Sequence, residues 1–319
     1  MTAGHPTPAV PTALLADRIR RAGDVAADHG VDLLLVTPGT DLRYLLDADG
    51  ASHERLTCLV LPASGHRAPP ALVVPRLEAP GWAGLPLADL GVEVVTWNDG
   101  EDPYLLVSDL AGGPTRLAVA DAMPAKHVFG LREALPEAAQ TLAGPIVSEL
   151  RMRKDTAEVE QLRAAGAAID RVHARMGEFL KAGRTEAQVG ADIAAAIVEE
   201  GHTAAAFVIV GSGPNGASPH HDVSDRVIES GDVVVVDIGG PLPSGYYSDS
   251  TRTYAVGAEP PARVQEAYAA LQDAQERAVA AVRPERSGPA GDAHGEPGVD
   301  PVLVGVHCRQ QASSAWRSA

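Results

Sequence analysis

The feature that most constrains this chain is a pair of β-rich runs that carry aspartates and are joined by a short turn-forming segment. The first run, residues 231–240, reads Gly-Asp-Val-Val-Val-Val-Asp-Ile-Gly-Gly, and the second covers residues 245–254. The segment Pro-Leu-Pro-Ser separates them, which predicts a β-hairpin. With a symmetric turn centred on Pro243, Asp237 and Asp249 are expected directly opposite each other, on one face of the sheet.

Two carboxylates in that arrangement need a neutralising group. Directly opposed Cβ atoms lie roughly 4.5–5.5 Å apart, so like charges there repel. Asp237 also shares its face with Val233 and Val235. A shared proton, an Arg or Lys partner, or a metal cation would relieve the repulsion. Arg252 is expected on the opposite face from Asp249 and is therefore badly placed to neutralise it. This favours a metal cation as the neutralising group. The alternative is that both aspartates are solvated, one ending a strand and the other capping a loop.

Two threonines and a histidine complete the candidate site. Thr251 and Thr253 share the expected face of Asp249, where their hydroxyls could orient its oxygens. His220 lies in a loop that precedes Asp237 in the sequence. A histidine beside a metal–carboxylate cluster can hydrogen-bond a substrate carbonyl or shuttle a proton. Taken alone, however, His220 is better interpreted as a surface-loop residue.

The spacing of apolar residues predicts an α/β domain in the first half of the chain. A helix is expected over residues 12–29, where apolar positions recur at helical spacing. Short apolar runs bounded by Gly, Pro and Asp predict strands at residues 32–37, 56–62, 71–75, 92–97 and 116–120. We expect this domain to cover residues 1–148.

A second domain is expected over residues 149–284, where the pattern changes. Asp155 with Glu158, and Thr185 with Gln188, have the spacing of capping boxes. They predict two amphipathic helices that end at Gly183 and Gly201. Three strands and a further helix are expected at residues 206–211, 232–239, 246–256 and 261–282.

Composition limits the partners and the location. The net charge of −16 repels phosphate backbones and anionic lipid, which argues against nucleic acid and membrane partners. Cys58 and Cys308 are too few for a disulfide framework, and Cys58 lies in an apolar run typical of a core. The N-terminus lacks the pattern of a signal peptide, and no apolar stretch has transmembrane length. We expect a cytoplasmic protein.

From the long helix onward, the sequence resembles the pita-bread metallopeptidases, the family of Xaa-Pro dipeptidase, aminopeptidase P and methionine aminopeptidase. The segments that carry the resemblance are RMRKDTAEVEQLRAAGAAID, GRTEAQVGADI, VGSGPNGASPHHDVSDRVIESGDVVVVDIGG and GYYSDSTRTYAVG. DLLLVTPGTDLRYLL is similar to the creatinase-type N-terminal domain, which methionine aminopeptidases lack. The resemblance covers residues 12–284 and implies a two-domain fold of mixed α/β and α+β class, with a pita-bread catalytic domain.

The resemblance also implies roles for the candidate residues. Asp237 would bind one metal through both oxygens, Asp249 would bridge two metals, and His220, rather than His221, would assist at the scissile carbonyl. The implied cofactors are two divalent ions (manganese, cobalt or zinc). The implied substrate is a peptide with proline after the scissile bond, and the implied assembly of the full-length protein is a homodimer.

The C-terminal region departs from the family pattern. From about Glu285 both periodicity and resemblance are lost, and the family's histidine segment and two glutamate ligands are not found. Glu296, His294 and His307 are interpreted as chance echoes of ligand motifs. We therefore expect a truncated catalytic domain and an aberrant tail over residues 285–319, as after a frameshift. With two acidic ligands in place of five, the chain is expected to be inactive or poorly folded.

Two other function classes stay open. A creatinase-like hydrolase would use the same fold without metal, and a non-catalytic pita-bread binding module would need no metal carboxylates. Asp237 and Asp249 favour the metallopeptidase over both classes.

Overall fold

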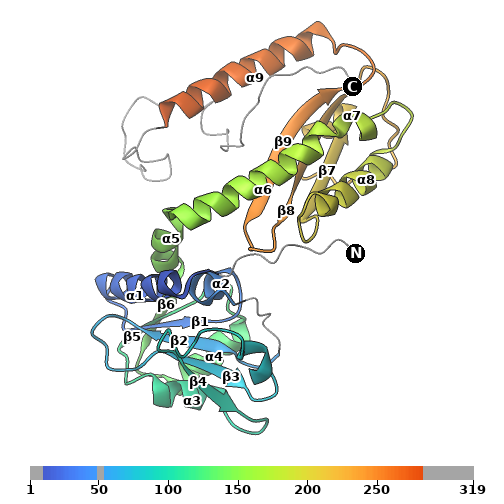
Figure 1. Ribbon diagram of the computed structural model, residues 1–319. Coiled ribbons are helices and arrows are strands. Elements are labelled where there is room, and N and C mark those ends of the chain that lie inside the picture. Colours follow the sequence, from blue (N-terminus) through green and yellow to red (C-terminus); the bar gives the residue numbers. More distant parts are fainter. Residues whose placement is uncertain (1–9, 49–53, 283–319) are drawn as a thin grey trace. The chain divides into compact units, whose positions relative to one another are not determined.

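The computed structural model describes residues 10–48 and 54–282, which form two compact units divided between Lys154 and Asp155 (Figure 1). The expectations for the tail at residues 285–319 lie outside the described residues. The division falls later in the chain than the expected change at residue 149. The reason is that helix α5 (Gly144–Met152) packs against α1 (Thr12–Asp28) and so belongs to the first unit.

A six-stranded mixed sheet forms the centre of the first unit, in the order β4-β3-β2-β1-β5-β6. The strands are β1 (Leu33–Val36), β2 (Cys58–Pro62), β3 (Ala71–Pro75), β4 (Glu93–Trp97), β5 (Arg116–Val119) and β6 (Ala139–Leu142). Strand β1 pairs antiparallel with β2 and parallel with β5. Strands β1 and β3 are buried along their whole length, as expected for a sheet covered on both faces.

Helices cover this sheet in two groups. Helix α1 contacts α2 (Thr40–Leu46), α5 and strands β1 and β2, whereas α3 (Pro103–Leu110) contacts α4 (Ala125–Ala134) and β3. In Figure 1, α1 and α2 lie on one side of the strands and α3 on the other. The short 3-10 helix η1 (Ala79–Trp82) belongs to the connection from β3 to β4. The sequence predicted α1 and the first five strands but not α2 to α5 or β6, because short elements carry too few apolar repeats to establish a period.

The second unit contains a three-stranded antiparallel sheet in the order β7-β8-β9. The elements are α6 (Thr156–Ala174), α7 (Met176–Phe179), α8 (Glu186–Glu199), β7 (Phe207–Ser212), η2 (Gly213–Ala217), β8 (Val233–Pro241), β9 (Tyr247–Ala255) and α9 (Ala262–Ala281). Helix α6 packs against β9, and α8 against β7 (Figure 1).

Capping boxes begin two of these helices, as the sequence predicted. The side chain of Asp155 accepts from the Glu158 amide at 2.8 Å, and Glu158 accepts in return from the Asp155 amide at 2.9 Å. Thr185 and Gln188 form the same reciprocal pair at the start of α8. The single helix expected up to Gly183 is wrong: α6 ends at Ala174, and α7 follows as one short turn.

The sheet of the second unit has two different faces. Val234, Val236 and Ile238 of β8 are fully buried and join the core beneath α6 and α8. The alternate residues of β8 point to the other face, where Val233 and Val235 are only half-buried. We call this second face the carboxylate face; it comprises Val233, Val235, Asp237 and Gly239 of β8 and Asp249, Thr251 and Thr253 of β9. Among the described helices, none has both the length and the apolarity to cross a membrane.

Candidate functional site

Asp237 is a buried carboxylate near the middle of β8. Its side chain is only 6% exposed, and its Oδ1 accepts a hydrogen bond of 2.5 Å from the Thr251 hydroxyl on β9. Burial of a carboxylate is costly unless hydrogen bonds or a cation compensate it. Asp237 therefore occupies the kind of position that the sequence predicted, on a sheet face and close to polar groups of the next strand.

The expected direct opposition of Asp237 and Asp249 is wrong. Asp237 pairs with Thr251, and Asp249 pairs with Gly239. The turn is centred on Ser244 rather than Pro243: the Gly245 amide donates to the Leu242 carbonyl at 2.8 Å, and Gly245 adopts a φ of +82°. With Gly245 in this left-handed conformation, each residue of β8 pairs with a β9 residue two positions later than expected.

The change of register preserves the shared face. Side chains alternate along a strand, so a shift of two residues returns Asp249 to the side of the sheet on which Asp237 lies. The two aspartates are diagonal neighbours, a relationship that places backbone positions about 7–8 Å apart. Asp249 is exposed, whereas Asp237 is buried, so the two carboxylates differ in environment.

The threonines and Arg252 lie on the faces that the sequence predicted, but their contacts differ. Thr251 donates to Asp237 and not to Asp249, because the register places it opposite Asp237. Thr253 pairs with Val235, and in the described part of the chain its hydroxyl has no hydrogen bond to either aspartate. Arg252 points to the opposite face, where it donates to the Ser250 hydroxyl at 3.0 Å. The predicted role of Thr251 and Thr253 in orienting Asp249 is not seen.

Asp237 and Asp249 have the chemistry of metal ligands but do not complete a metal site. Carboxylate oxygens suit divalent cations, which take four or more ligands in closed protein sites. Within residues 10–48 and 54–282, no group of three or more His, Cys, Asp or Glu side chains is placed to hold an ion. The two aspartates therefore fit as contributors of two carboxylates to a site that requires further ligands.

His220 lies on an exposed loop between η2 and the segment that pairs back onto the start of α8. In the described residues no hydrogen bond or ion pair joins it to Asp237 or Asp249. The neighbouring residue His221 is different: its side chain is only 16% exposed, and its Nε2 donates to Glu186 Oε2 at 2.7 Å. The two adjacent histidines thus face different surroundings.

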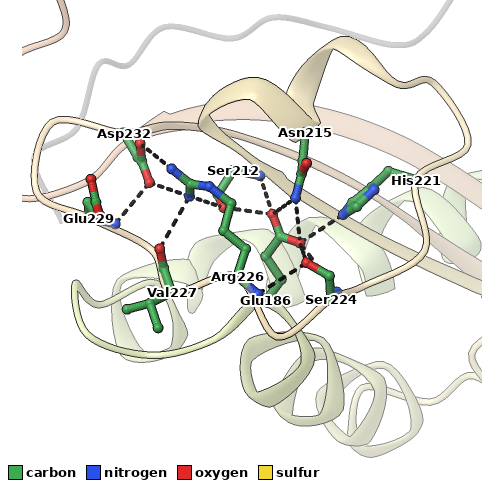
Figure 2. Close-up of polar contacts among 9 residues, drawn as sticks. All are labelled: Glu186, Ser212, Asn215, His221, Ser224, Arg226, Val227, Glu229 and Asp232. Carbon is green, nitrogen blue, oxygen red and sulfur yellow. Dashed lines mark hydrogen bonds and ion pairs between the residues drawn. The ribbon is translucent and has the colours of Figure 1, made fainter.

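Glu186 is the centre of a polar network that the sequence did not reveal (Figure 2). The side chain is fully buried in the first turn of α8. Its Oε1 accepts from the Ser212 amide at 2.7 Å and from the Ser212 hydroxyl at 2.6 Å, and its Oε2 accepts from the Ser224 hydroxyl at 2.7 Å. The Asn215 side-chain amide donates to both oxygens, at 3.1 and 3.2 Å. Together with His221, these donors surround the carboxylate.

These hydrogen bonds keep Glu186 ionised. Burial by itself raises the pKa of the carboxyl group, but the hydrogen bonds from Ser212, Ser224 and His221 outweigh it and lower the pKa to about 2. A buried carboxylate that accepts this many hydrogen bonds is a rigid anchor. Both serine hydroxyls donate to Glu186 rather than to His221, so the group lacks the hydroxyl–imidazole contact of a serine hydrolase.

A second ion pair continues the network toward β8. Arg226 Nη1 donates to the Ser212 hydroxyl at 2.6 Å and to Asp232 Oδ2 at 2.6 Å, as Figure 2 shows. Gly213 allows this close approach: it adopts a φ of +51°, and a Cβ atom there would lie 2.7 Å from the Arg226 guanidinium. Ser212, the last residue of β7, is therefore held by both Glu186 and Arg226 at the point where the loop begins.

The position of Glu186 in the sequence does not point to this network. Glu186 follows the cap residue Thr185 and reads as an acidic residue that favours the start of a helix. Its partners lie 26 to 38 residues later, with no spacing that links them to α8. The signal that was present is the density of Ser, Asn and His in residues 212–224, in a loop that carries a candidate catalytic histidine.

Both units match known families. Residues 18–153 match the Creatinase/Prolidase N-terminal domain, and residues 160–296 match metallopeptidase family M24. The probable dipeptidase PepE of Mycobacterium tuberculosis is 53% identical over 270 residues, which cover 84% of this chain and 71% of that protein. An Xaa-Pro dipeptidase of Lactobacillus helveticus is 27% identical over 267 residues, or 81% of this chain and 70% of that protein.

A solved structure supports the same assignment. The crystal structure of dipeptidase PepE from Mycobacterium ulcerans superposes with a TM-score of 0.81 and 54% sequence identity, covering 86% of this chain and 73% of that one. The expected two-domain fold, with a creatinase-type domain followed by a pita-bread domain, is thereby confirmed. This chain belongs to metallopeptidase family M24 and carries a Creatinase/Prolidase N-terminal domain.

Proposed function

We propose that this protein hydrolyses dipeptides, preferentially at the bond that precedes proline, with the help of divalent metal ions. The observation that carries the proposal is Asp237, a carboxylate that is 6% exposed and that shares one sheet face with Asp249. A buried acid of this kind is a natural cation ligand. The preference for proline is supported by the relative that is named as an Xaa-Pro dipeptidase.

In this proposal the residues have separate roles. Asp237 and Asp249 supply carboxylates to two ions of manganese, cobalt or zinc, and Thr251 orients Asp237 through its hydroxyl. Bound divalent ions polarise a carbonyl and activate water for hydrolysis. His220, on its exposed loop, donates a hydrogen bond to the carbonyl of the bound peptide. Two carboxylates alone bind an ion weakly, so we expect low metal affinity and low activity from the residues described.

Metal binding is the first test. The purified chain, stripped with a chelator, is titrated with manganese and followed by electron paramagnetic resonance. We expect Asp237→Asn and Asp249→Asn each to weaken binding about tenfold or more, because each removes a charged ligand. Asp273→Asn is the matched control: Asp273 is exposed on α9 and pairs with Arg277 at 3.1 Å. Equal manganese affinity in all four proteins would refute the assignment of the aspartates.

Hydrolysis is the second test. Ala-Pro and Ala-Ala are incubated with the chain and manganese, cobalt or zinc, and the released amino acids are quantified. We expect slow, metal-dependent cleavage of Ala-Pro that disappears in Asp237→Asn. Cleavage that survives the chelator would favour a metal-free, creatinase-like reaction, and binding without cleavage would favour a non-catalytic module. Equal rates for both dipeptides would remove the preference for proline.

Two further features belong to the same proposal. We propose that the protein is a cytoplasmic homodimer and that its ligands are peptides rather than nucleic acid or membranes. The acidic composition, with a net charge of −16, supports the last point. Light scattering of the purified chain measures its oligomeric state directly, and a monomeric mass would contradict the homodimer.

A further inference from the structure

One buried carboxylate holds both arms of the loop that carries His220. On the outgoing arm, Glu186 accepts hydrogen bonds from Ser212 and Asn215. On the returning arm, it accepts from His221 and Ser224. Figure 2 shows the carboxylate between these two sets of donors. A single side chain of α8 thus binds both ends of the segment from Asn215 to His221.

The backbone of the returning arm is tied to the same helix start. The Ala187 amide donates to the Ser224 carbonyl at 2.9 Å, and the Glu186 amide donates to the Arg226 carbonyl at 3.1 Å. These amides belong to the first turn of α8, where backbone donors lack intrahelical acceptors. Backbone carbonyls of the loop therefore accept hydrogen bonds from the helix start, while side chains of the loop donate to the Glu186 carboxylate. Hydrogen bonds thus join the two segments in both directions.

Packing reinforces these bonds. Gly190 of α8 has no side chain, and a Cβ atom there would lie 2.9 Å from Val223 Cγ1, so the loop rests against the helix at this point. On the other side, a Cβ atom at Gly211 would lie 3.0 Å from the Asn215 carbonyl oxygen, so η2 folds tightly onto β7. The outgoing arm of the loop therefore packs against β7 and the returning arm against α8, and the tip that carries His220 is exposed.

We propose that Glu186 is a positioning residue that sets the direction in which His220 presents its imidazole to the peptide. His221 is bonded to Glu186, so the backbone of the residue next to His220 is fixed, while His220 itself stays exposed. The inference rests on the proposed function, because it assigns His220 a substrate to meet. It adds a residue that contacts neither the substrate nor the metal.

Hydrogen exchange tests the clamp without any enzymatic activity. Glu186→Gln replaces one carboxylate oxygen by an NH₂ group, which then faces the hydrogen-bond donors that the oxygen had accepted from. We therefore expect the backbone amides of residues 213–225 to exchange about tenfold faster or more. Amides of residues 234–238 are expected to keep their protection. Glu199→Gln is the matched control, because Glu199 is an exposed residue of α8 that pairs with Arg175 at 2.9 Å. Unchanged exchange in the loop, or an equal increase throughout the second unit, would overturn the clamp.

A milder variant covers the case in which Glu186→Gln fails to fold. Ser224→Ala removes one hydroxyl donor from the returning arm and leaves the carboxylate with its remaining donors. We expect faster exchange confined to residues 219–225, with unchanged protection of residues 234–238. Exchange identical to the parent chain would show that the returning arm does not depend on this hydrogen bond and would count against the clamp.

Kinetics then separate positioning from general stability. We expect Glu186→Gln to lower kcat/KM for Ala-Pro about tenfold or more, but by less than about twofold when His220 is already replaced by alanine. A residue that only stabilises the fold would lower the rate by the same factor in both backgrounds, and that result would overturn the positioning role. If the parent chain cleaves no dipeptide, the proposed function fails, while the exchange experiment still decides whether Glu186 holds the loop.

Discussion

The sheets of the two units differ in how their faces are used. In the first unit, β1 and β3 are buried on both faces, and their residues are apolar throughout. In the second unit, β8 buries Val234, Val236 and Ile238 against helices, whereas its other face presents Asp237. A sheet covered on both faces can only accommodate apolar runs, whereas a sheet with one helix-packed face can carry polar chemistry on the other.

The same contrast appears in the buried polar residues. The second unit buries two histidines, two glutamates, three serines and Asp237; they are Glu158, His173, Glu186, His202, Ser212, Asp237, Ser248 and Ser250. The first unit buries fewer polar side chains; they are Arg18, Thr37, Thr57 and His127. Stability of the second unit therefore depends more on hydrogen bonds to titratable groups, and that of the first more on apolar packing.

The largest effect is expected from truncating the core of the first unit. Leu59 of β2 is completely buried, so Leu59→Ala should destabilise that unit by about 2–5 kcal/mol. Val235→Ala removes a half-buried side chain from the carboxylate face and should cost about 1 kcal/mol or less. Urea unfolding followed by hydrogen exchange of peptides from each unit measures both values. Similar losses of unfolding free energy in the two variants would show that the two sheets do not differ in how far their faces are buried.

A smaller effect is expected from acid, mainly in the second unit. His173 Nε2 donates to the Ser250 carbonyl and Nδ1 accepts from the Tyr254 hydroxyl, so the neutral ring fits the site. Burial lowers the pKa of His173 to about 4. The unfolded chain takes up this proton first, so stability is present above pH 6.5 and declines by about 3 kcal/mol as the pH falls toward 4.

Histidine variants measure this dependence in each unit. His173→Gln keeps a donor for Ser250 and removes the titration, so the unfolding free energy of the second unit should vary less between pH 6.5 and 4. His127 of the first unit also has a pKa lowered by burial, and His127→Gln is the matched comparison. An acid response that is unchanged in His173→Gln would show that other groups, such as His202, dominate it.

The smallest effect is expected from helix caps, which should act alike in both units. Thr185→Ala in the second unit and Asp102→Ala in the first each remove a side-chain acceptor at a helix start. Each should cost about 1 kcal/mol. Thr185→Ser retains the hydroxyl and should remain within about 0.5 kcal/mol of the parent chain. Thermal unfolding of the three variants checks these values, and a much larger loss at Thr185 would mean that its neighbour Glu186 is also displaced.

Much of the fold could be predicted from local patterns in the sequence. Capping boxes at Asp155 and Thr185 marked helix starts, because the groups that form them are adjacent in the chain. The alternation of side chains placed Asp237 and Asp249 on one face, and that prediction survived a change of register because the shift was even. The family resemblance, read from contiguous segments, was likewise confirmed.

The conformation of one turn and the contacts between distant segments account for what the sequence left open. The register of β8 and β9 depended on Gly245 adopting a left-handed conformation in the turn, which placed Thr251 rather than Asp249 opposite Asp237. The Glu186 network depended on a loop folding back onto a helix that starts well before it in the chain. Chain-local rules describe neighbours in sequence, whereas a buried charge selects its partners from whatever the folded chain brings within hydrogen-bond distance.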